Sequence, residues 1–210
     1  MTNTNDSGAG SLRQAIIDAN TNNNDPAVDC IAFNISGNGP HTISPTSALP
    51  SIGEPPTING YTQGDTTATT TDDATENTQA QGTDAVLKIQ LSGTSTTNEF
   101  GLLIDASNAV IRRMVVNNFD AAGILIGSGT GHRIEGNFIG TDPSGTTAQP
   151  NDNSGVAVSD QPKDSTIGGT APAARNLLSG NTDDGVEFSG SGSTGIKIQG
   201  NLIGTQKDGT

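Results

Sequence analysis

The carboxylates Asp183 and Asp184 are the side chains of this sequence best suited to acid–base chemistry, in a polar segment ahead of Gly185. Hydrolysis of a glycosidic bond needs two carboxyl groups facing each other across about 5–9.5 Å, one of them to protonate the leaving oxygen. Adjacent residues of an extended strand point to opposite sides, so this pair does not meet that requirement. We therefore predict no catalytic centre, and Asp183 and Asp184 remain the candidates if the protein is an enzyme.

Oxygen-rich turns provide the metal candidates. Asp142 and Asp208 each lie among Gly, Ser or Thr residues, and turns of this kind offer the oxygen ligands that Ca²⁺ takes. Neither has the spacing of an EF-hand. His41 and His132 lie far apart in the sequence, which does not support a zinc site. We expect no metal or other cofactor, with Ca²⁺ at Asp142 or Asp208 as the alternative.

Three further reactive side chains have a structural interpretation. Cys30 is the sole cysteine, which excludes an internal disulfide and a Cys-x-x-Cys metal site. It lies in an apolar run at 29–33, which predicts a buried, inert thiol. Arg112 and Arg113 are adjacent, and we expect surface ion pairs there rather than a base for polysaccharide elimination.

The composition excludes several classes of partner. The 210 residues carry a net charge of −13, and only nine are Lys or Arg, so we expect no nucleic acid to bind. No run of eighteen apolar residues occurs, so we expect no membrane insertion. Hydrophobic residues make up only 30% of the chain, a fraction typical of disorder at this charge. Their regular spacing, however, indicates a fold.

An internal repeat is the strongest pattern in the sequence. A Gly followed by apolar residues recurs four times, and two further short apolar elements follow each copy. The copies are Gly101-Leu102-Leu103-Ile104, Gly123-Ile124-Leu125-Ile126, Gly155-Val156-Ala157-Val158 and Gly185-Val186-Glu187-Phe188. The segments 134–141 and 198–205 match almost residue for residue. Three short strands per unit bury little alone, so the repeat predicts coils stacked about 4.8 Å apart around a narrow apolar axis.

The repeat predicts one all-β solenoid domain over residues 1–210. Regular coils begin at Gly101, Gly123, Gly155 and Gly185, and the first coils occupy 30–100 with a long surface loop at 63–83. We expect these four glycines to supply turn conformations. Asn137, Asn176 and Asn201 precede the third strand of their coils, and we expect them to stack and to hydrogen-bond along the axis.

Residues 1–29 are expected to form an N-terminal cap. Leu12, Ala15, Ile16 and Ala19 fall on one face of a helix over 11–20. Ser11 can cap that helix, with Gln14 completing a capping box. We expect the helix to cover the first coil, whose core and strand edge would otherwise be open.

These coils resemble the right-handed parallel β-helix repeats of large bacterial surface and secreted proteins. The opening 7–16, Ser-Gly-Ala-Gly-Ser-Leu-Arg-Gln-Ala-Ile, is similar to the N-terminal cap named for its CSLREA motif, although Gly10 and Gln14 replace its Cys and Glu. The resemblance covers nearly the whole chain. It implies a three-sheet, right-handed, pectate-lyase-like solenoid and an extracellular or cell-surface location. The resemblance indicates the fold rather than a function, since such coils occur in adhesins, anchors, lyases and epimerases alike.

Two functions stay open at this point. The first is a non-catalytic structural or adhesive module, and the second is a carbohydrate-binding or carbohydrate-active β-helix. Polygalacturonase-like hydrolases resemble this fold, but here the Gly131-His132-Arg133 segment precedes the Asn181-Thr182-Asp183-Asp184 segment, which reverses their motif order. We expect a carbohydrate or another cell-surface ligand as the partner. We also expect a longer parent solenoid or self-association at the C-terminal edge, because no terminal cap follows 207–210.

Overall fold

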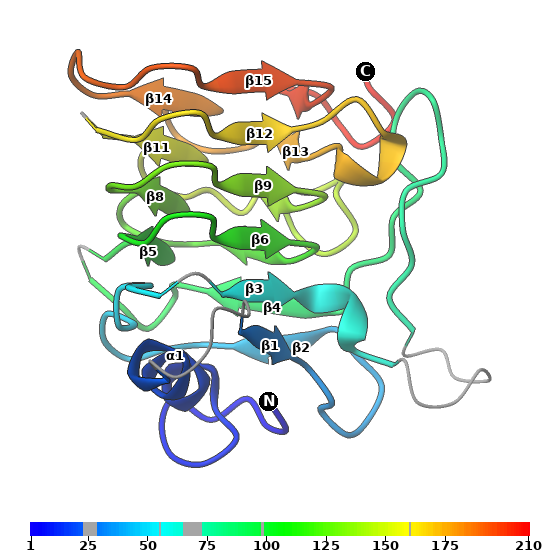
Figure 1. Ribbon diagram of the computed structural model, residues 1–210. Helices are drawn as coiled ribbons and strands as arrows, with labels where there is room; N and C mark the ends of the chain where they lie inside the picture. The colour runs from blue at the N-terminus through cyan, green and yellow to red at the C-terminus, as the bar shows by residue number, and fades with distance from the viewer. Residues whose placement is uncertain (23–28, 55, 65–72, 98, 160) are drawn as a thin grey trace.

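A computed structural model shows a parallel β-solenoid with one short helix (Figure 1). It describes residues 1–22, 29–54, 56–64, 73–97, 99–159 and 161–210. Sheet A contains β1 (Cys30–Ala32), β3 (Thr57–Asn59), β6 (Val110–Arg112), β9 (Arg133–Glu135), β12 (Thr166–Gly168) and β15 (Lys197–Gln199). Sheet B contains β2 (His41–Ile43), β4 (Ile89–Ser92), β7 (Val115–Asn117), β10 (Phe138–Ile139), β13 (Leu177–Leu178) and β16 (Leu202–Ile203). Sheet C contains β5 (Leu102–Ile104), β8 (Ile124–Ile126), β11 (Val156–Val158) and β14 (Val186–Phe188).

The chain visits sheets A, B and C in turn, and each strand pairs in parallel with its counterpart in the next coil. In Figure 1 the strands of sheet A run from left to right on the near side, the chain then passes to the rear, and successive coils rise from the N-terminus. That path is right-handed. The predicted all-β, single-stranded, right-handed parallel β-helix with a capping helix is therefore confirmed.

A stack of isoleucines forms one wall of the core. The middle residue of every strand in sheet A points inward, and the pairing register places these residues directly above one another. The stack consists of Ile31, Ile58, Ile111, Ile134, Ile167 and Ile198. A fully buried isoleucine stabilises the fold by about 1.5–3 kcal/mol. A narrow core of this kind explains how so few apolar residues suffice.

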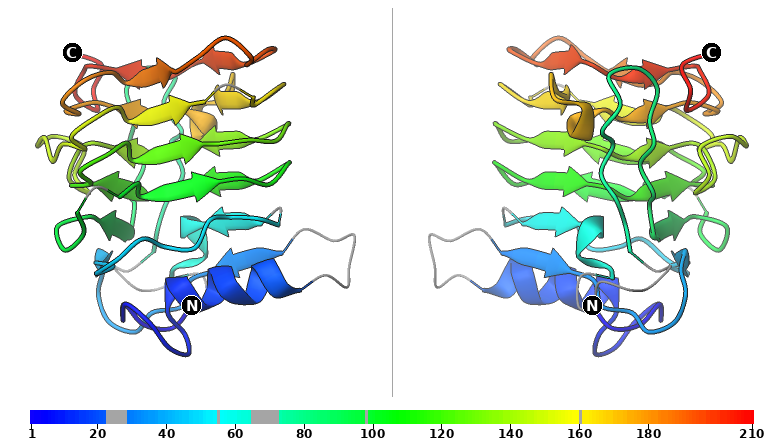
Figure 2. Two further views of the ribbon diagram at one scale, coloured as in Figure 1. Left: turned by 90° about the vertical axis from the view of Figure 1, so that its left-hand side faces the viewer. Right: turned by 90° about the vertical axis from the view of Figure 1, so that its right-hand side faces the viewer.

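The helix α1 (Leu12–Thr21) closes the N-terminal end of the solenoid (Figure 2). Leu12, Ile16 and Ala19 are buried and join the core beneath the first coil. The Ser11 hydroxyl accepts a hydrogen bond from the Gln14 amide, as expected of an N-cap. The second half of the predicted capping box does not form, because the Gln14 side chain donates to Asp18 instead.

The two ends of the solenoid differ in what they expose. At the end opposite α1, the axial side chains Phe188, Ile198 and Ile203 are 47%, 42% and 48% exposed. The same inward positions in earlier coils, such as Ile167 and Leu178, are fully buried.

The prediction for Cys30 is wrong, because the thiol is exposed. Residues alternate between the two sides of a strand, and in β1 the buried residue is Ile31. Cys30 and Ala32 therefore point away from the core. The apolar run around Cys30 concealed this alternation.

Residues 73–88 form a hairpin that runs along the outside of the coils, and we call it the axial hairpin. Thr75 and Val86 pair in an antiparallel bridge, so the described part of the predicted loop is more regular than expected. Residues 65–72 of that loop lie outside the described residues. Figures 1 and 2 show the hairpin rising from the level of β3 to the level of the last coil and returning. It covers an apolar stripe on the outer face of sheet B, which comprises Val115, Phe138, Leu177 and Leu202 and packs with Tyr61, Ala85 and Leu87.

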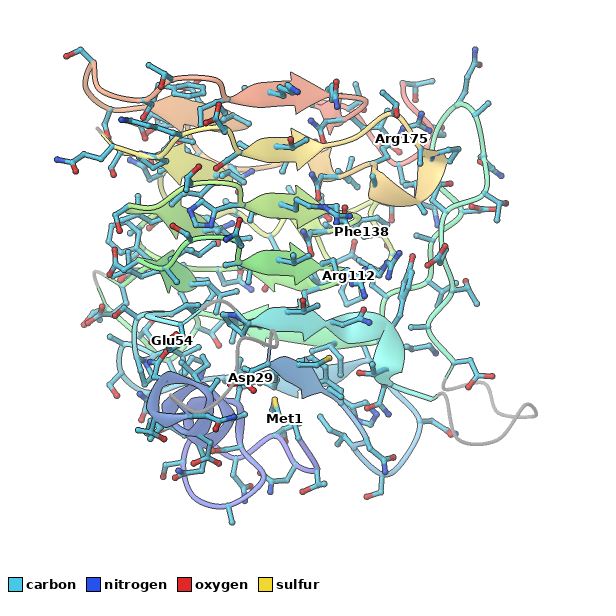
Figure 3. All side chains as sticks on the ribbon, viewed as in Figure 1. Met1, Asp29, Glu54, Arg112, Phe138 and Arg175 are labelled. Atoms are coloured by element: carbon cyan, nitrogen blue, oxygen red, sulfur yellow. The ribbon has the colours of Figure 1, made fainter. Side chains whose placement is uncertain are left out.

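The tip of the axial hairpin is fixed by Arg175, which follows the short helix η2 (Pro172–Ala174) (Figure 3). The Arg175 guanidinium donates to the carbonyls of Gln79, Ala80 and Gly82 at 3.1, 2.9 and 2.6 Å. The Thr83 amide also donates to the Lys207 carbonyl at 2.6 Å. These bonds join the second coil to the last two.

The foot of the axial hairpin is held by charge. Arg113 pairs with Glu76 at 2.6 Å and lies over the Tyr61 ring, 4.1 Å from its centroid. Burial raises the pKa of Tyr61 to about 12. The predicted surface ion pair of Arg113 is thus present, and it fastens the hairpin to the solenoid.

Replacing Arg175 tests this attachment. In Arg175→Ala the three hairpin carbonyls lose the guanidinium donor, and only the long bonds from Asn77 to Gln79 and Gly82 remain, so we expect a loss of about 1–3 kcal/mol of stability and faster amide hydrogen exchange in 77–84. Arg175→Lys keeps the charge without the forked geometry and should fall between the two proteins. Unchanged exchange in 77–84 of Arg175→Ala would show that apolar packing alone holds the hairpin.

Candidate functional site

Buried asparagines form a ladder at the corner between sheets A and B. The Asn137 amide nitrogen and side chain donate to Asn176 Oδ1 at 2.9 and 3.2 Å. Asn176 Nδ2 in turn donates to Asn201 Oδ1 at 2.9 Å and to the Ile134 carbonyl at 2.7 Å. Asn137 and Asn176 are fully buried, where water cannot reach them, so these bonds within the protein satisfy their polar groups. The structure thus brings together the three asparagines expected to stack, and they hold coil to coil.

These asparagines do not themselves take the left-handed backbone conformation that the sequence suggested. The residue before each ladder position takes it in three coils, namely Arg113, Gly136 and Gly200, with φ of 67°, 68° and 69°. The ladder position in the earliest of these coils is Met114, whose amide donates to Asn137 Oδ1 at 3.0 Å. In each of these turns, one residue takes the left-handed conformation that bends the chain, and the next residue makes the hydrogen bond to the neighbouring coil.

A second ladder lies at the corner between sheets B and C and was missed in the sequence. Asn151 Nδ2 donates to Asn181 Oδ1 at 2.9 Å, and Asn181 Nδ2 donates to the Ile139 carbonyl at 3.1 Å. The Phe119 amide donates to Asn151 Oδ1 at 3.1 Å and extends the ladder by one coil. A signal for it was present, since Asn151 and Asn181 each precede a repeat glycine by four residues.

The glycines that open the coils have a different role from the one predicted. None of Gly101, Gly123, Gly155 and Gly185 has a positive φ, so none supplies a left-handed turn. They permit close packing of coils instead. A Cβ on Gly123 would lie 2.8 Å from Ile139 Cγ2, and one on Gly155 would lie 2.9 Å from Asn181 Nδ2. Glycine is needed there because the second ladder passes next to the backbone.

The structure places Asp183 and Asp184 in an exposed turn before β14. The Asp183 amide donates to the Asn153 carbonyl, and the Asp184 carbonyl accepts from the Gly155 amide, so their backbones continue the ladder between coils. His132 lies just before β9 in sheet A, at another corner. The fragments that resemble a hydrolase motif therefore do not converge on one site.

The two calcium candidates serve to close their own turns. Asp142 accepts from the Ser144 hydroxyl and from the amides of Thr146 and Thr147 at 3.1 and 3.0 Å. Burial acts to raise the pKa of Asp142, but these hydrogen bonds outweigh it and leave the pKa below its usual range. Asp208 accepts from the Thr210 hydroxyl and amide at 2.7 and 3.0 Å, and the hydroxyl bond is the main cause of its lowered pKa.

The two histidines are part of the packing. His41 Nε2 lies 3.2 Å from the side-chain amide of Gln63. His132 is fully buried, and its Nε2 lies 2.9 Å from the Ser128 carbonyl oxygen. Burial lowers the pKa of His132, although that hydrogen bond acts in the opposite direction. Within the described ranges, no group of three or more His, Cys, Asp or Glu side chains could hold a metal ion.

Comparison with family models, with curated proteins and with solved structures found no match to this chain. Among the helices that the structure describes, none is long and apolar enough to cross a bilayer. The functional argument therefore depends on the geometry of the solenoid.

The asparagine ladder can be tested by removing its donors. In Asn176→Asp the Ile134 carbonyl and Asn201 Oδ1 lose their donor and face a buried carboxylate, so we expect a loss of at least about 3 kcal/mol. Asn201→Asp keeps the acceptor for Asn176 and is half-buried, so we expect a loss of about 1 kcal/mol. Urea unfolding measures both, and equal losses would contradict the ladder's importance.

The lowered pKa of His132 predicts that the protein becomes less stable in mild acid. Its pKa is lower in the folded state than in the unfolded state, so between that folded pKa and about 6.5 the unfolded state binds more protons. Stability should therefore fall as the pH drops through this window. His132→Gln should show a weaker fall in the free energy of unfolding between pH 7 and pH 5, measured by urea titration. Identical pH profiles would exclude a contribution from His132.

Proposed function

We propose that this chain is a non-catalytic structural and adhesive β-solenoid module of a bacterial cell-surface or secreted protein. The observation that carries the proposal is the use of its buried polar side chains. Asn137, Asn151 and Asn176 are fully buried and bond one coil to the next. Buried polar groups engaged in this way stabilise a rigid body, since each is satisfied within the protein.

The couplings between coils support a role in bearing load. In an ordinary solenoid each repeat contacts only its neighbours, so stability is a sum of local terms. Here Ala85 and Leu87 of the axial hairpin belong to one apolar cluster, against which Tyr61 of the second coil and Leu202 of the last both pack. Arg175 and Lys207 bind the same hairpin near its tip. A module tied along its length should resist force as one body.

The surface supports a solvated, extracellular setting for this body. The chain is rich in Thr, Asn and Ser, and the net charge of −13 keeps separate copies apart. Three of the exposed large apolar side chains, Phe188, Ile198 and Ile203, lie together at the last coil. Self-association through that end stays a prediction.

A turnover assay distinguishes this proposal from a carbohydrate-active solenoid. The protein is incubated with neutral and acidic polysaccharides, and reducing ends and unsaturated uronate products are measured. We expect no product above that of the double variant Asp183→Asn/Asp184→Asn, since these adjacent carboxylates do not face each other. Turnover that the double variant loses would overturn the non-catalytic function. As the positive arm, pulling the chain by its ends should show one main unfolding event, and coil-by-coil unfolding would contradict a load-bearing module.

A further inference from the structure

The corner between sheets C and A is built differently from the other two corners. The corners between A and B and between B and C each carry asparagine side chains that bond one coil to the next. At the corner between C and A, no asparagine side chain among the described residues makes such a bond. The inward positions just before the strands of sheet A are held by Ala109, His132, Ser165 and Ile196. This corner therefore depends on other contacts.

His132 lies at the centre of these contacts and is fully buried. Its backbone amide donates to Ser165 Oγ at 3.1 Å, and the Ser165 hydroxyl donates to the Lys163 carbonyl at 3.0 Å. The Gly131 amide donates to the same Lys163 carbonyl, and the Lys163 amide donates to the Gly129 carbonyl, both at 3.0 Å. The bonds that join these two turns therefore all lie within a few residues of His132.

One nitrogen of the His132 ring has no partner. The Ser128 carbonyl oxygen can only accept, so Nε2, which lies 2.9 Å from it, carries the proton of the neutral ring. Nδ1 is buried and has no hydrogen-bond partner among the described residues. A second proton on Nδ1 would put a charged donor without an acceptor into the interior, which is strongly unfavourable. The closed corner therefore accommodates only the neutral ring.

The charges around this corner do not stabilise a protonated ring. The described charged residues of the adjoining turns and of the start of β9 are Asp105, Arg133, Lys163 and Asp164. All four are exposed, and they comprise two acids and two bases. Arg133 is also paired with Glu135 on the outer face of sheet A. Burial is the main cause of the lowered pKa of His132, and only the hydrogen bond to the Ser128 carbonyl opposes it.

We propose that His132 is an acid-sensitive latch, whose protonation opens the corner between sheets C and A while the two corners that carry asparagine ladders stay closed. The charged ring gains water when the turn at 127–132 moves outward, because Nδ1 has no acceptor inside the corner. Asparagine amides do not titrate in this range, so the ladders lose no bond. The bonds from Arg175 to the axial hairpin end on carbonyls and also persist. The module thus loosens along one edge in mild acid without unfolding, which is independent of the function proposed above.

Amide hydrogen exchange of the wild type at pH 7 and pH 5, corrected for the intrinsic rate of each amide, tests this latch. Opening takes up one proton below about 6.5, so we expect the opening equilibrium at the amides of Gly131, His132 and Lys163 to rise on the order of tenfold. The amides of Phe119 and Asn137 donate to ladder asparagines and should show no such rise. An equal rise at all five amides would indicate global unfolding and would overturn the latch.

Variants of the two histidines identify the group that titrates. His132→Gln removes the imidazole and should abolish the pH dependence at Gly131 and Lys163, whereas His41→Gln, the matched change of the other histidine, should retain it. Retention of the pH dependence in His132→Gln would overturn the proposal. Titration of the His132 ring in the wild type, followed by NMR, is a second test that needs no variant. Titration of that ring at about 6.5 with unchanged amide exchange would also overturn the proposal.

Discussion

Hydrogen bonding between buried amides at the corners of the solenoid is the interaction on which the other features depend. A coil must turn three times, and each turn places backbone groups where water does not reach. Asn137, Asn151 and Asn176 satisfy these groups and at the same time fix the height of the next coil. Once the corners are in register, the isoleucines of sheet A fall above one another. The corner hydrogen bonds therefore set the register in which the core side chains stack.

The axial hairpin changes what kind of solenoid this is. Coils that touch only their neighbours can separate one at a time. Ala85 and Leu87 share one apolar cluster with Val115, Phe138 and Leu177, so the hairpin couples coils that are distant in the chain. Covering sheet B in this way leaves sheet A as the open face, and Arg112, Arg133 and Lys197 lie on its strands.

The sequence predicted the elements that repeat and missed those that do not. The match between 134–141 and 198–205 identified the coils and the Asn137 ladder, because stacked units need the same residue at the same place. The Asn151–Asn181 ladder was equally periodic but lies in loops of different length, which hid it. The alternation that exposes Cys30 was hidden by an apolar run of three strand residues. The axial hairpin has no repeat partner, so its position had no signal.

The sequence by itself determined the class of fold, the inward stack and the capping helix, because spacing along a chain fixes which side chains share a face. Only the tertiary structure decided which corners are bonded, which sheet is covered and which charges gather. Arg112, Arg133 and Lys197 are separated by many residues, and their proximity exists only when coils stack in register. The close approach at Gly123 and Gly155 is of the same kind, since it depends on the neighbouring coil rather than on the local chain.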